Sequence, residues 1–153
     1  MSDVEASQDD WVAILSGAID AGAAIATVSE AQAGGIAVFL GTTRAEKSSA
    51  GKELIALDYE AYEAMALDQM LQLAAEARQR WPIRKLVLLH RVGRVDVGQP
   101  SVLIAVATPH RSQAFDACRF LIDMLKSQAT IWKKEIWTDG SQSWVHPQEK
   151  PKA

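Results

Sequence analysis

The sequence predicts an α+β protein with a largely antiparallel or mixed sheet. Strand-like segments, either alternating or continuously apolar, are interspersed with two long segments of helical periodicity. They do not follow a regular strand-helix-strand repeat, which argues against a purely parallel sheet. A chain of 153 residues is long enough to bury a core. We therefore expect one domain over residues 11–145, with a flexible N-terminus at residues 1–10 and a flexible tail at residues 146–153.

The N-terminal part of this domain predicts two strands and a helix. Residues 11–16 fit a short strand, and the alanine-rich residues 20–28 fit a helix. Residues 36–44 (IAVFLGTTR) begin as a continuous apolar run, which predicts a strand buried on both faces. Residues 45–52 are small and polar, so we expect a mobile loop there.

The middle of the chain predicts a strand followed by a long helix. Residues 53–62 alternate, and the face expected to point to the core carries Ile55, Leu57, Tyr59 and Ala61. Residues 63–80 have apolar side chains at helical spacing, and Pro82 enforces the end of this helix. The apolar stripe consists of Leu67, Met70, Leu71 and Ala74.

The C-terminal half predicts four strands and a second long helix. Residues 85–91 and 101–107 fit strands, separated by a segment in which Gly93, Gly98 and Pro100 mark turns. The helix spans residues 109–128, and its expected buried face carries Phe115, Cys118, Leu121, Ile122 and Leu125. Residues 131–137 and 143–145 fit the two strands of a hairpin.

Composition and charge exclude several classes of protein. Sixteen Lys and Arg against nineteen Asp and Glu give a net charge of -3, which argues against a general nucleic-acid-binding module. The acidic N-terminus resembles no secretory leader, and no apolar run is long enough to cross a membrane. We therefore expect a cytoplasmic protein. The single cysteine, Cys118, excludes an internal disulfide and is expected to be a small buried side chain.

Positive charge is concentrated in one stretch of this acidic chain, at His110, Arg111, Lys126, Lys133 and Lys134. Thr108 can cap a helix that starts at Pro109, which places His110 and Arg111 in the first turn. Helix N-termini attract anions, and cations there cost some stability unless an anion compensates. The pattern therefore predicts an anion-binding site at this helix start.

The lysines that follow this helix fit a proton-transfer site. The β-branched and aromatic residues around Lys133 favour a strand, on which Lys133 and Glu135 face one way and Lys134 the other. A lysine in a half-enclosed cationic pocket has a lowered pKa and can exchange a proton near neutral pH. Taken singly, each of these lysines is more often a solvated surface residue.

Other chemistries lack their motifs. The sequence has no phosphate-binding glycine loop, no serine elbow and no paired-cysteine or HExxH metal arrangement, so we expect neither a cofactor nor a metal. His90, His110 and His146 are too scattered to indicate a metal centre. We interpret His90 and Arg91 as structural. Two roles remain open for Trp132, Trp137 and Trp144, which either line a pocket or pack the last hairpin.

Several separated blocks of this sequence resemble one family. They are FLGTTR, LDYEAYEAMA, HRVGRVDVGQPSVLIAVATPHRSQAFDACRFLIDMLKSQATIWKKE and the closing Trp-Val. In this order they resemble the large, catalytic subunit of molybdopterin synthase over about residues 11–145. The resemblance implies an α/β hammerhead-like fold with an additional antiparallel β subdomain.

The resemblance also implies an activity and partners. Members of this family convert cyclic pyranopterin monophosphate into molybdopterin by installing two dithiolene sulfurs. A small ubiquitin-like sulfur-carrier subunit delivers each sulfur as a C-terminal Gly-Gly thiocarboxylate, which explains why the chain has no nucleophile motif. A homodimer of the large subunit lies within a heterotetramer. The alternative function is that of a non-catalytic anion-binding or scaffold protein of the same fold.

Site residues follow from the resemblance by motif position. It implies that Lys126 and Lys133 are catalytic. The substrate-binding residues that it implies are Thr42, Thr43, Arg44, His110, Arg111, Lys134 and Glu135. Two positions depart from the family pattern. Thr130 stands where many members have proline, which is expected to loosen the turn between the lysines, and the tail offers only Lys150 and Lys152 as candidates for a basic residue that reaches a neighbouring subunit.

Overall fold

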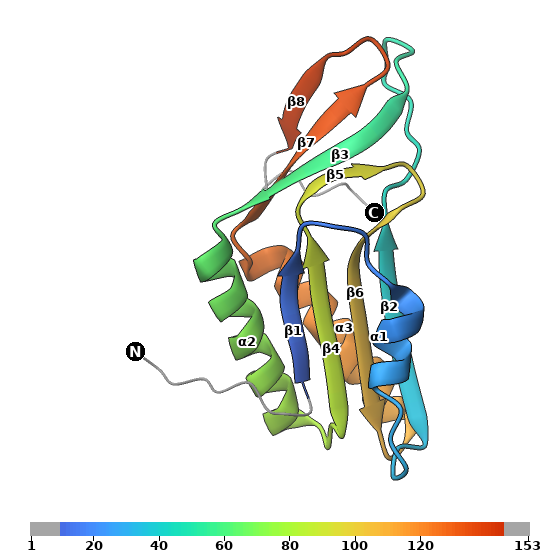
Figure 1. Ribbon diagram of the computed structural model, residues 1–153, viewed down its shortest axis with the longest axis vertical. Coiled ribbons are helices and arrows are strands. Elements are labelled where there is room, and N and C mark those ends of the chain that lie inside the picture. Colours follow the sequence, from blue (N-terminus) through green and yellow to red (C-terminus); the bar gives the residue numbers. More distant parts are fainter. Residues whose placement is uncertain (1–9, 146–153) are drawn as a thin grey trace.

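The computed structural model describes residues 10–145, which form three helices and two four-stranded sheets stacked along the long axis of the molecule (Figure 1). The helices are α1 (Ala21–Thr27), α2 (Glu63–Arg80) and α3 (Arg111–Gln128). The strands are β1 (Asp10–Leu15), β2 (Gly35–Thr42), β3 (Leu54–Ala61), β4 (Lys85–Arg91), β5 (Gly93–Asp96), β6 (Pro100–Thr108), β7 (Ile131–Trp137) and β8 (Gln142–Val145). The first sheet has the order β1-β4-β6-β2 and the second the order β5-β3-β7-β8.

The predicted α+β class is confirmed. Strands β1 and β4 pair in parallel, whereas the other ladders of both sheets are antiparallel. One strand was missed, because β5 lies in the segment predicted as turns. It is only four residues long, and its first residue Gly93 and the following Gly98 have positive φ values of 87° and 89°, which is why turn signals dominate this segment.

The expected flexible ends lie mostly outside the described residues, which exclude 1–9 and 146–153. His146, Lys150 and Lys152 are therefore also outside them. Asp10 is an exception, because it is the first residue of β1 and not part of a loose terminus. The Asp10 side chain is 4% exposed, and its carboxylate accepts hydrogen bonds from Nε and Nη2 of Arg78 at 2.9 and 2.7 Å. This pair fixes the start of β1 against the end of α2.

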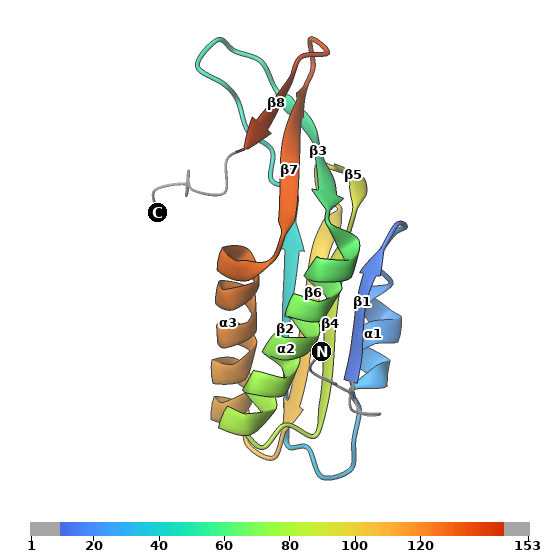
Figure 2. The same ribbon diagram turned by 90° about the vertical axis from the view of Figure 1, so that its left-hand side faces the viewer.

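Helices α2 and α3 cover one face of the first sheet (Figure 2). Alternate residues of β4, Leu86 and Leu88, point into this layer and pack with Met70 of α2 and Leu121 of α3. The stripe predicted on α2 is only partly right. Met70 and Ala74 are buried, but Leu67 and Leu71 are half-buried, and the buried line is completed by Ala66, Leu73 and Ala77.

Burial along α3 confirms one prediction and contradicts another. Cys118 is 6% exposed, as expected for a small buried side chain, and burial raises the pKa of its thiol to about 11. Phe115 was expected in the core but is 65% exposed. The buried face begins at Ala114, and one further residue turns the helix by about 100°, so Phe115 points to solvent.

The opposite face of the first sheet is covered by α1, which packs on β4 and β6. The edge strand β2 lies beyond this short helix, so the prediction that its strand is buried on both faces is wrong. Ile36, Val38 and Leu40, on its outward face, are 41–42% exposed. Among residues 10–145, none of the helices combines the length and the apolar content that crossing a membrane requires.

Strand β3 carries the predicted alternation only in part. Leu57 is buried, as expected, but Leu54 and Ala56 on the other face are buried as well. Ala56 lies between β5 and β7, opposite Asp96 and Ile136, and its small side chain is easily covered by those neighbours. The simple division of β3 into a core face and a solvent face therefore fails in its first half.

Candidate functional site

The two lysines expected to be catalytic lie on either side of the turn between α3 and β7. Lys126 is exposed in the last turn of α3, and Lys133 lies in β7. The predicted strand over residues 131–137 is thus confirmed. Helix α3 packs on the first sheet and β7 belongs to the second, and Figure 2 shows that the chain passes from one part of the fold to the other between them. The two lysines are therefore carried by the elements on either side of this junction.

Strand alternation separates Lys134 from Lys133. Lys133 is directly opposite Tyr59 of β3, whereas Lys134 is opposite Asp58, so the two lysines point to different faces of the second sheet. Lys134 Nζ lies 4.0 Å from Asp58 Oδ2 and 5.0 Å from the centre of the Trp144 ring. Trp144 therefore packs on the last hairpin, and Lys134 does not share the face of Lys133.

Lys133 is surrounded by charged side chains of both signs. Burial lowers its pKa below the ordinary lysine value, and the positive charges of Lys126 and Arg44 act in the same direction. The carboxylates of Glu135 and Glu46 oppose this effect. The structure thus brings Arg44, Lys126, Lys133 and Glu135 from the predicted set within electrostatic reach, and it adds Glu46, which sequence reasoning missed. Its sequence signal was weak: an acid two residues after Arg44.

The segment after β2 carries Arg44 into this region. The Arg44 side chain is 78% exposed, and its Nη2 donates to Glu46 Oε1 at 3.1 Å. Thr42 is exposed at the end of β2. Thr43, by contrast, is 2% exposed, and its hydroxyl donates to the carbonyl of Val95 at 3.3 Å. Its hydroxyl thus anchors the loop base to β5.

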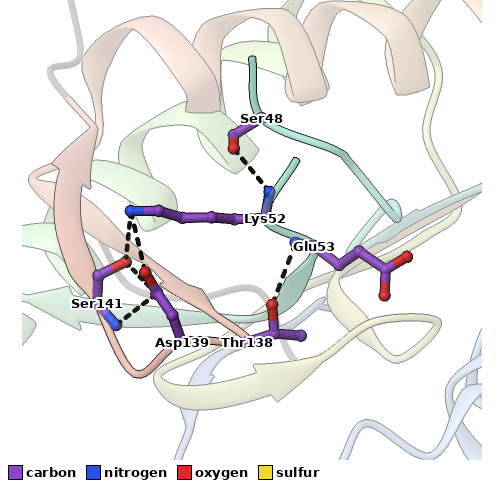
Figure 3. A network of polar contacts seen from close by, with 6 residues as sticks. All are labelled: Ser48, Lys52, Glu53, Thr138, Asp139 and Ser141. Carbon is purple, nitrogen blue, oxygen red and sulfur yellow. Dashed lines mark hydrogen bonds and ion pairs between the residues drawn. The ribbon is translucent and has the colours of Figure 1, made fainter. Parts of the chain in front are cut away.

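The loop predicted to be mobile is tied to the β7–β8 turn (Figure 3). Lys52 Nζ lies 3.1 Å from Asp139 Oδ2 and donates to Ser141 Oγ at 3.3 Å. The hydroxyl and backbone N–H of Ser141, followed by Lys52, hold the pKa of Asp139 at about 2. The Glu53 N–H donates to Thr138 Oγ1 at 3.3 Å. These contacts fix the far end of the loop whose near end carries Arg44.

An open hollow of about 390 Å³ lies beside this loop. It is lined by Ser48, Ser49, Ala50, Lys52, Trp137, Ser141, Gln142 and Ser143. All of these residues belong to the loop or to the β7–β8 hairpin, and no residue of α3 is among them.

The start of α3 differs from the prediction. The helix begins at Arg111, with His110 in an extended conformation as its N-cap, so only Arg111 lies in the first turn. Thr108 belongs to β6 and is not the cap; its hydroxyl donates to the carbonyl of His110 at 2.6 Å. The His110 N–H instead donates to Gln113 Oε1 at 3.3 Å. His110 and Gln113 therefore take the capping role that was expected of Thr108.

His110 and Arg111 do not join the other predicted cations within one chain. Lys126 follows Arg111 by fifteen residue steps along α3, a rise of about 22 Å at 1.5 Å per residue. Strand β2 indicates a similar separation. Its first residue, Gly35, lies against the start of α3, because a Cβ there would be 2.8 Å from the Arg111 Cα. Arg44 follows the other end of this strand, roughly 23 Å away. Within one chain, a helix and a strand therefore hold the two groups of cations at opposite ends.

His90 is a buried residue of β4, close enough to Lys133 for the lysine charge to act on its pKa. It is 8% exposed, its Nδ1–H donates to the carbonyl of Arg91 at 2.8 Å, and its ring centre lies 5.0 Å from that of Tyr59. Burial lowers the pKa of His90 to about 4, and the charge of Lys133 contributes. The structural interpretation of His90 agrees with this burial. Among residues 10–145, no group of three or more His, Cys, Asp and Glu side chains is placed to hold a metal.

His90 should make the fold less stable in mild acid. Its pKa is near 6.5 in the unfolded chain and about 4 in the folded chain, so the unfolded state binds more protons between these values. The contribution of neutral, buried His90 to the free energy of unfolding is fully present above pH 6.5. It falls by about 3 kcal/mol as the pH decreases toward 4. Urea unfolding at pH 7 and pH 4.5 measures the loss. An equal loss in a His90→Gln variant would contradict this origin.

The turn between the two lysines is well held. Thr130 stands where the family pattern has proline, and a looser turn was expected. The structure shows the opposite, because Thr130 N–H and Oγ1 both donate to Gln69 Oε1, at 2.8 and 3.1 Å. The hydrogen bonds to Gln69 therefore restrain the turn at the position where Thr130 replaces proline.

Comparisons with known proteins identify the family of this chain. The model of the MoaE protein family matches residues 14–128. A molybdopterin synthase catalytic subunit from Nostoc sp. is 50% identical, covering 73% of this chain and 67% of the relative, and one from Bos taurus is 37% identical, covering 97% and 78%.

Solved structures show the same fold. Molybdopterin synthase from Staphylococcus aureus has a TM-score of 0.82 at 31% identity, covering 88% of this chain and 96% of that one. A complex of subunits 1 and 2 of molybdopterin-converting factor from Helicobacter pylori has a TM-score of 0.74 at 23% identity, covering 90% and 92%. The chain therefore belongs to the MoaE protein family, in which these relatives are named molybdopterin synthase catalytic subunits.

Proposed function

We propose that this protein is the catalytic subunit of a molybdopterin synthase, which converts cyclic pyranopterin monophosphate into molybdopterin by inserting two dithiolene sulfurs. The observation that carries the proposal is the group of cations formed by Lys126, Lys133 and Arg44 at the junction of α3 and β7, on the fold of this family. Such a group stabilises negative charge but supplies no sulfur nucleophile. It therefore suits a reaction in which the nucleophilic sulfur arrives from outside.

The division of roles follows from the surroundings of each side chain. Lys133 is half-buried with a lowered pKa, so it is the better candidate of the two lysines to release and retake a proton. Lys126 is exposed at the helix end and is assigned to the charge that develops at the attacked carbon. Arg44, on the exposed loop, is assigned to the substrate phosphate, in exchange for its contact with Glu46.

The sulfur donor is a small ubiquitin-like subunit that ends in a Gly-Gly thiocarboxylate. Its anionic terminus complements the cations around Lys126, and two glycines can enter a narrow approach because they have no side chains. The Helicobacter pylori relative is described as a complex of two subunits, which supports a partner of this kind.

His110 and Arg111 fit this function only with a second copy of the chain. Within one chain they lie about 22 Å from Lys126, too far for one small substrate to reach both. In a homodimer, the start of α3 of one subunit can face the lysines of the other. We assign His110 and Arg111 to substrate binding in that arrangement, as part of a heterotetramer with two small subunits.

Replacing the two neighbouring lysines of β7 should have unequal effects. Lys133→Ala removes the proposed proton carrier and should reduce turnover by roughly 100-fold or more. Lys134→Ala should be milder, because this side chain faces Asp58 and Trp144 on the other side of the sheet. Steady-state turnover of the two variants, each checked for folding by circular dichroism, measures the difference. Equal losses would contradict assigning Lys133 alone to proton transfer.

Reconstitution tests the proposed activity. The purified protein is incubated with cyclic pyranopterin monophosphate and a small subunit that ends either in a thiocarboxylate or in a plain carboxylate. We expect molybdopterin only with the thiocarboxylate. If the protein binds the substrate but forms no product with either partner, the chain is an anion-binding scaffold of the same fold.

A further inference from the structure

Gln69 of α2 contacts the turn between the two lysines. Its Oε1 accepts hydrogen bonds from both the N–H of Thr130, at 2.8 Å, and the hydroxyl of Thr130, at 3.1 Å. A backbone N–H can only donate, so the side-chain atom that meets it must be the amide oxygen and not the nitrogen. Both donors of Thr130 thus converge on one acceptor from another element.

The remaining polar atom of Thr130 is also bound. Its carbonyl accepts from the N–H of Tyr62, the N-cap of α2, at 3.1 Å. All three polar atoms of this residue are therefore held by the first two turns of α2 and its cap. That helix is itself fixed in the core, because Met70, next to Gln69, is fully buried.

The position of this contact matters because the chain changes layer here. Helix α3 ends at Gln128 and packs on the first sheet, whereas β7 begins at Ile131 in the second sheet. Only Ala129 and Thr130 connect them. Lys126 and Lys133 are carried by these two different elements, so the conformation of this short link sets how far apart their side chains lie.

We propose that Gln69 is a positioning residue. Its two hydrogen bonds to Thr130, which we call the clasp, fix the turn and thereby hold Lys126 and Lys133 at a constant separation. This role rests on the proposed function, in which both lysines act on one substrate. Each hydrogen bond contributes modestly to stability. Its larger effect is geometric, since displacing a catalytic group by about 1 Å can cost about 100-fold in rate.

Two substitutions of Gln69 separate this role from simple packing. Gln69→Leu keeps the side-chain volume but removes the acceptor, whereas Gln69→Glu keeps an oxygen that can accept from both donors of Thr130. Thr130→Val removes only the hydroxyl and retains the N–H contact. The matched control is Gln72→Leu on the same helix, because Gln72 is exposed and its Nε2 donates only to Asp68, at 2.8 Å.

Hydrogen exchange of the Thr130 amide tests the clasp without any assay of activity. We expect its protection to be lost in Gln69→Leu and kept in both Gln69→Glu and Gln72→Leu. Unchanged protection in Gln69→Leu would show that the clasp does not hold the turn, and would overturn the proposal whether or not the protein is a synthase.

Kinetics of the reconstituted enzyme test the positioning. Well below the unfolding temperature, we expect kcat to fall roughly 10- to 100-fold in Gln69→Leu, with little change in KM, to fall less in Thr130→Val, and to recover in Gln69→Glu. If Gln69→Leu loses Thr130 protection but keeps the kcat of the wild type, the clasp is purely structural and the proposal is wrong. An inactive wild type with a protected Thr130 amide would count against the proposed function, while the clasp itself would stand.

Discussion

Lys126→Ala should nearly abolish molybdopterin formation and leave the fold intact. The side chain is exposed in the last turn of α3, so its removal creates no cavity. Its loss costs the helix end only about 0.3–1 kcal/mol of favourable dipole interaction. The reaction loses more, because a fixed positive charge at the attacked carbon disappears. Comparable losses of a preorganised charge-stabilising group reduce turnover by roughly 100- to 1,000-fold.

The measurement is single-turnover product formation with saturating thiocarboxylated partner, together with thermal unfolding of the variant. Arg119→Ala is the control, because it removes one positive charge from an exposed position of the same helix. We expect Arg119→Ala to keep the activity of the wild type. A folded Lys126→Ala protein with near-normal turnover would remove Lys126 from the proposed site.

Deleting the terminal Gly-Gly of the small subunit should stop sulfur transfer completely. The cationic group around Lys126 and Lys133 contains no sulfur nucleophile of its own, and Cys118 is 6% exposed with a thiol whose pKa is raised to about 11. In the proposed mechanism, all of the sulfur therefore comes from the partner's tail. Product formation should fall below detection, whereas binding of the two subunits should weaken far less, because their globular surfaces still dock.

Isothermal titration of the large subunit with full-length and truncated partner measures the binding, and the reconstitution assay measures the transfer. The control is a partner whose Gly-Gly is retained as a carboxylate, which should bind as the full-length protein does and transfer nothing. If the truncated partner still supported molybdopterin formation, sulfur would reach the substrate by another route. The cations would then have to be assigned to binding alone.

The sequence was most informative where a local pattern determines local structure. The β-branched and aromatic residues after Thr130 predict β7, and the alternation of that strand correctly places Lys133 and Lys134 on opposite faces. Pro82 likewise marks the stop after α2. These features depend on neighbours in the chain, which periodicity and propensity describe.

The sequence misled where proximity along the chain was taken as proximity in space. His110 and Lys126 belong to one cationic stretch, yet the rigid rise of α3 holds them about 22 Å apart. Conversely, Arg44 comes from a distant part of the chain and yet lies within electrostatic reach of Lys133, a proximity that no local pattern predicts. The roles of Tyr59, Gln69 and Glu46 depend on strand register and helix docking, which no local pattern specifies.

The most direct test of the central claim follows sulfur through the reaction. A small subunit carrying a thiocarboxylate labelled with a heavy sulfur isotope is mixed with the protein and cyclic pyranopterin monophosphate, and the product is analysed by mass spectrometry. The account predicts that both dithiolene sulfurs carry the label and that two partner tails return to carboxylate for each molybdopterin formed. Unlabelled product, or a substrate that stays bound and unchanged, would contradict it.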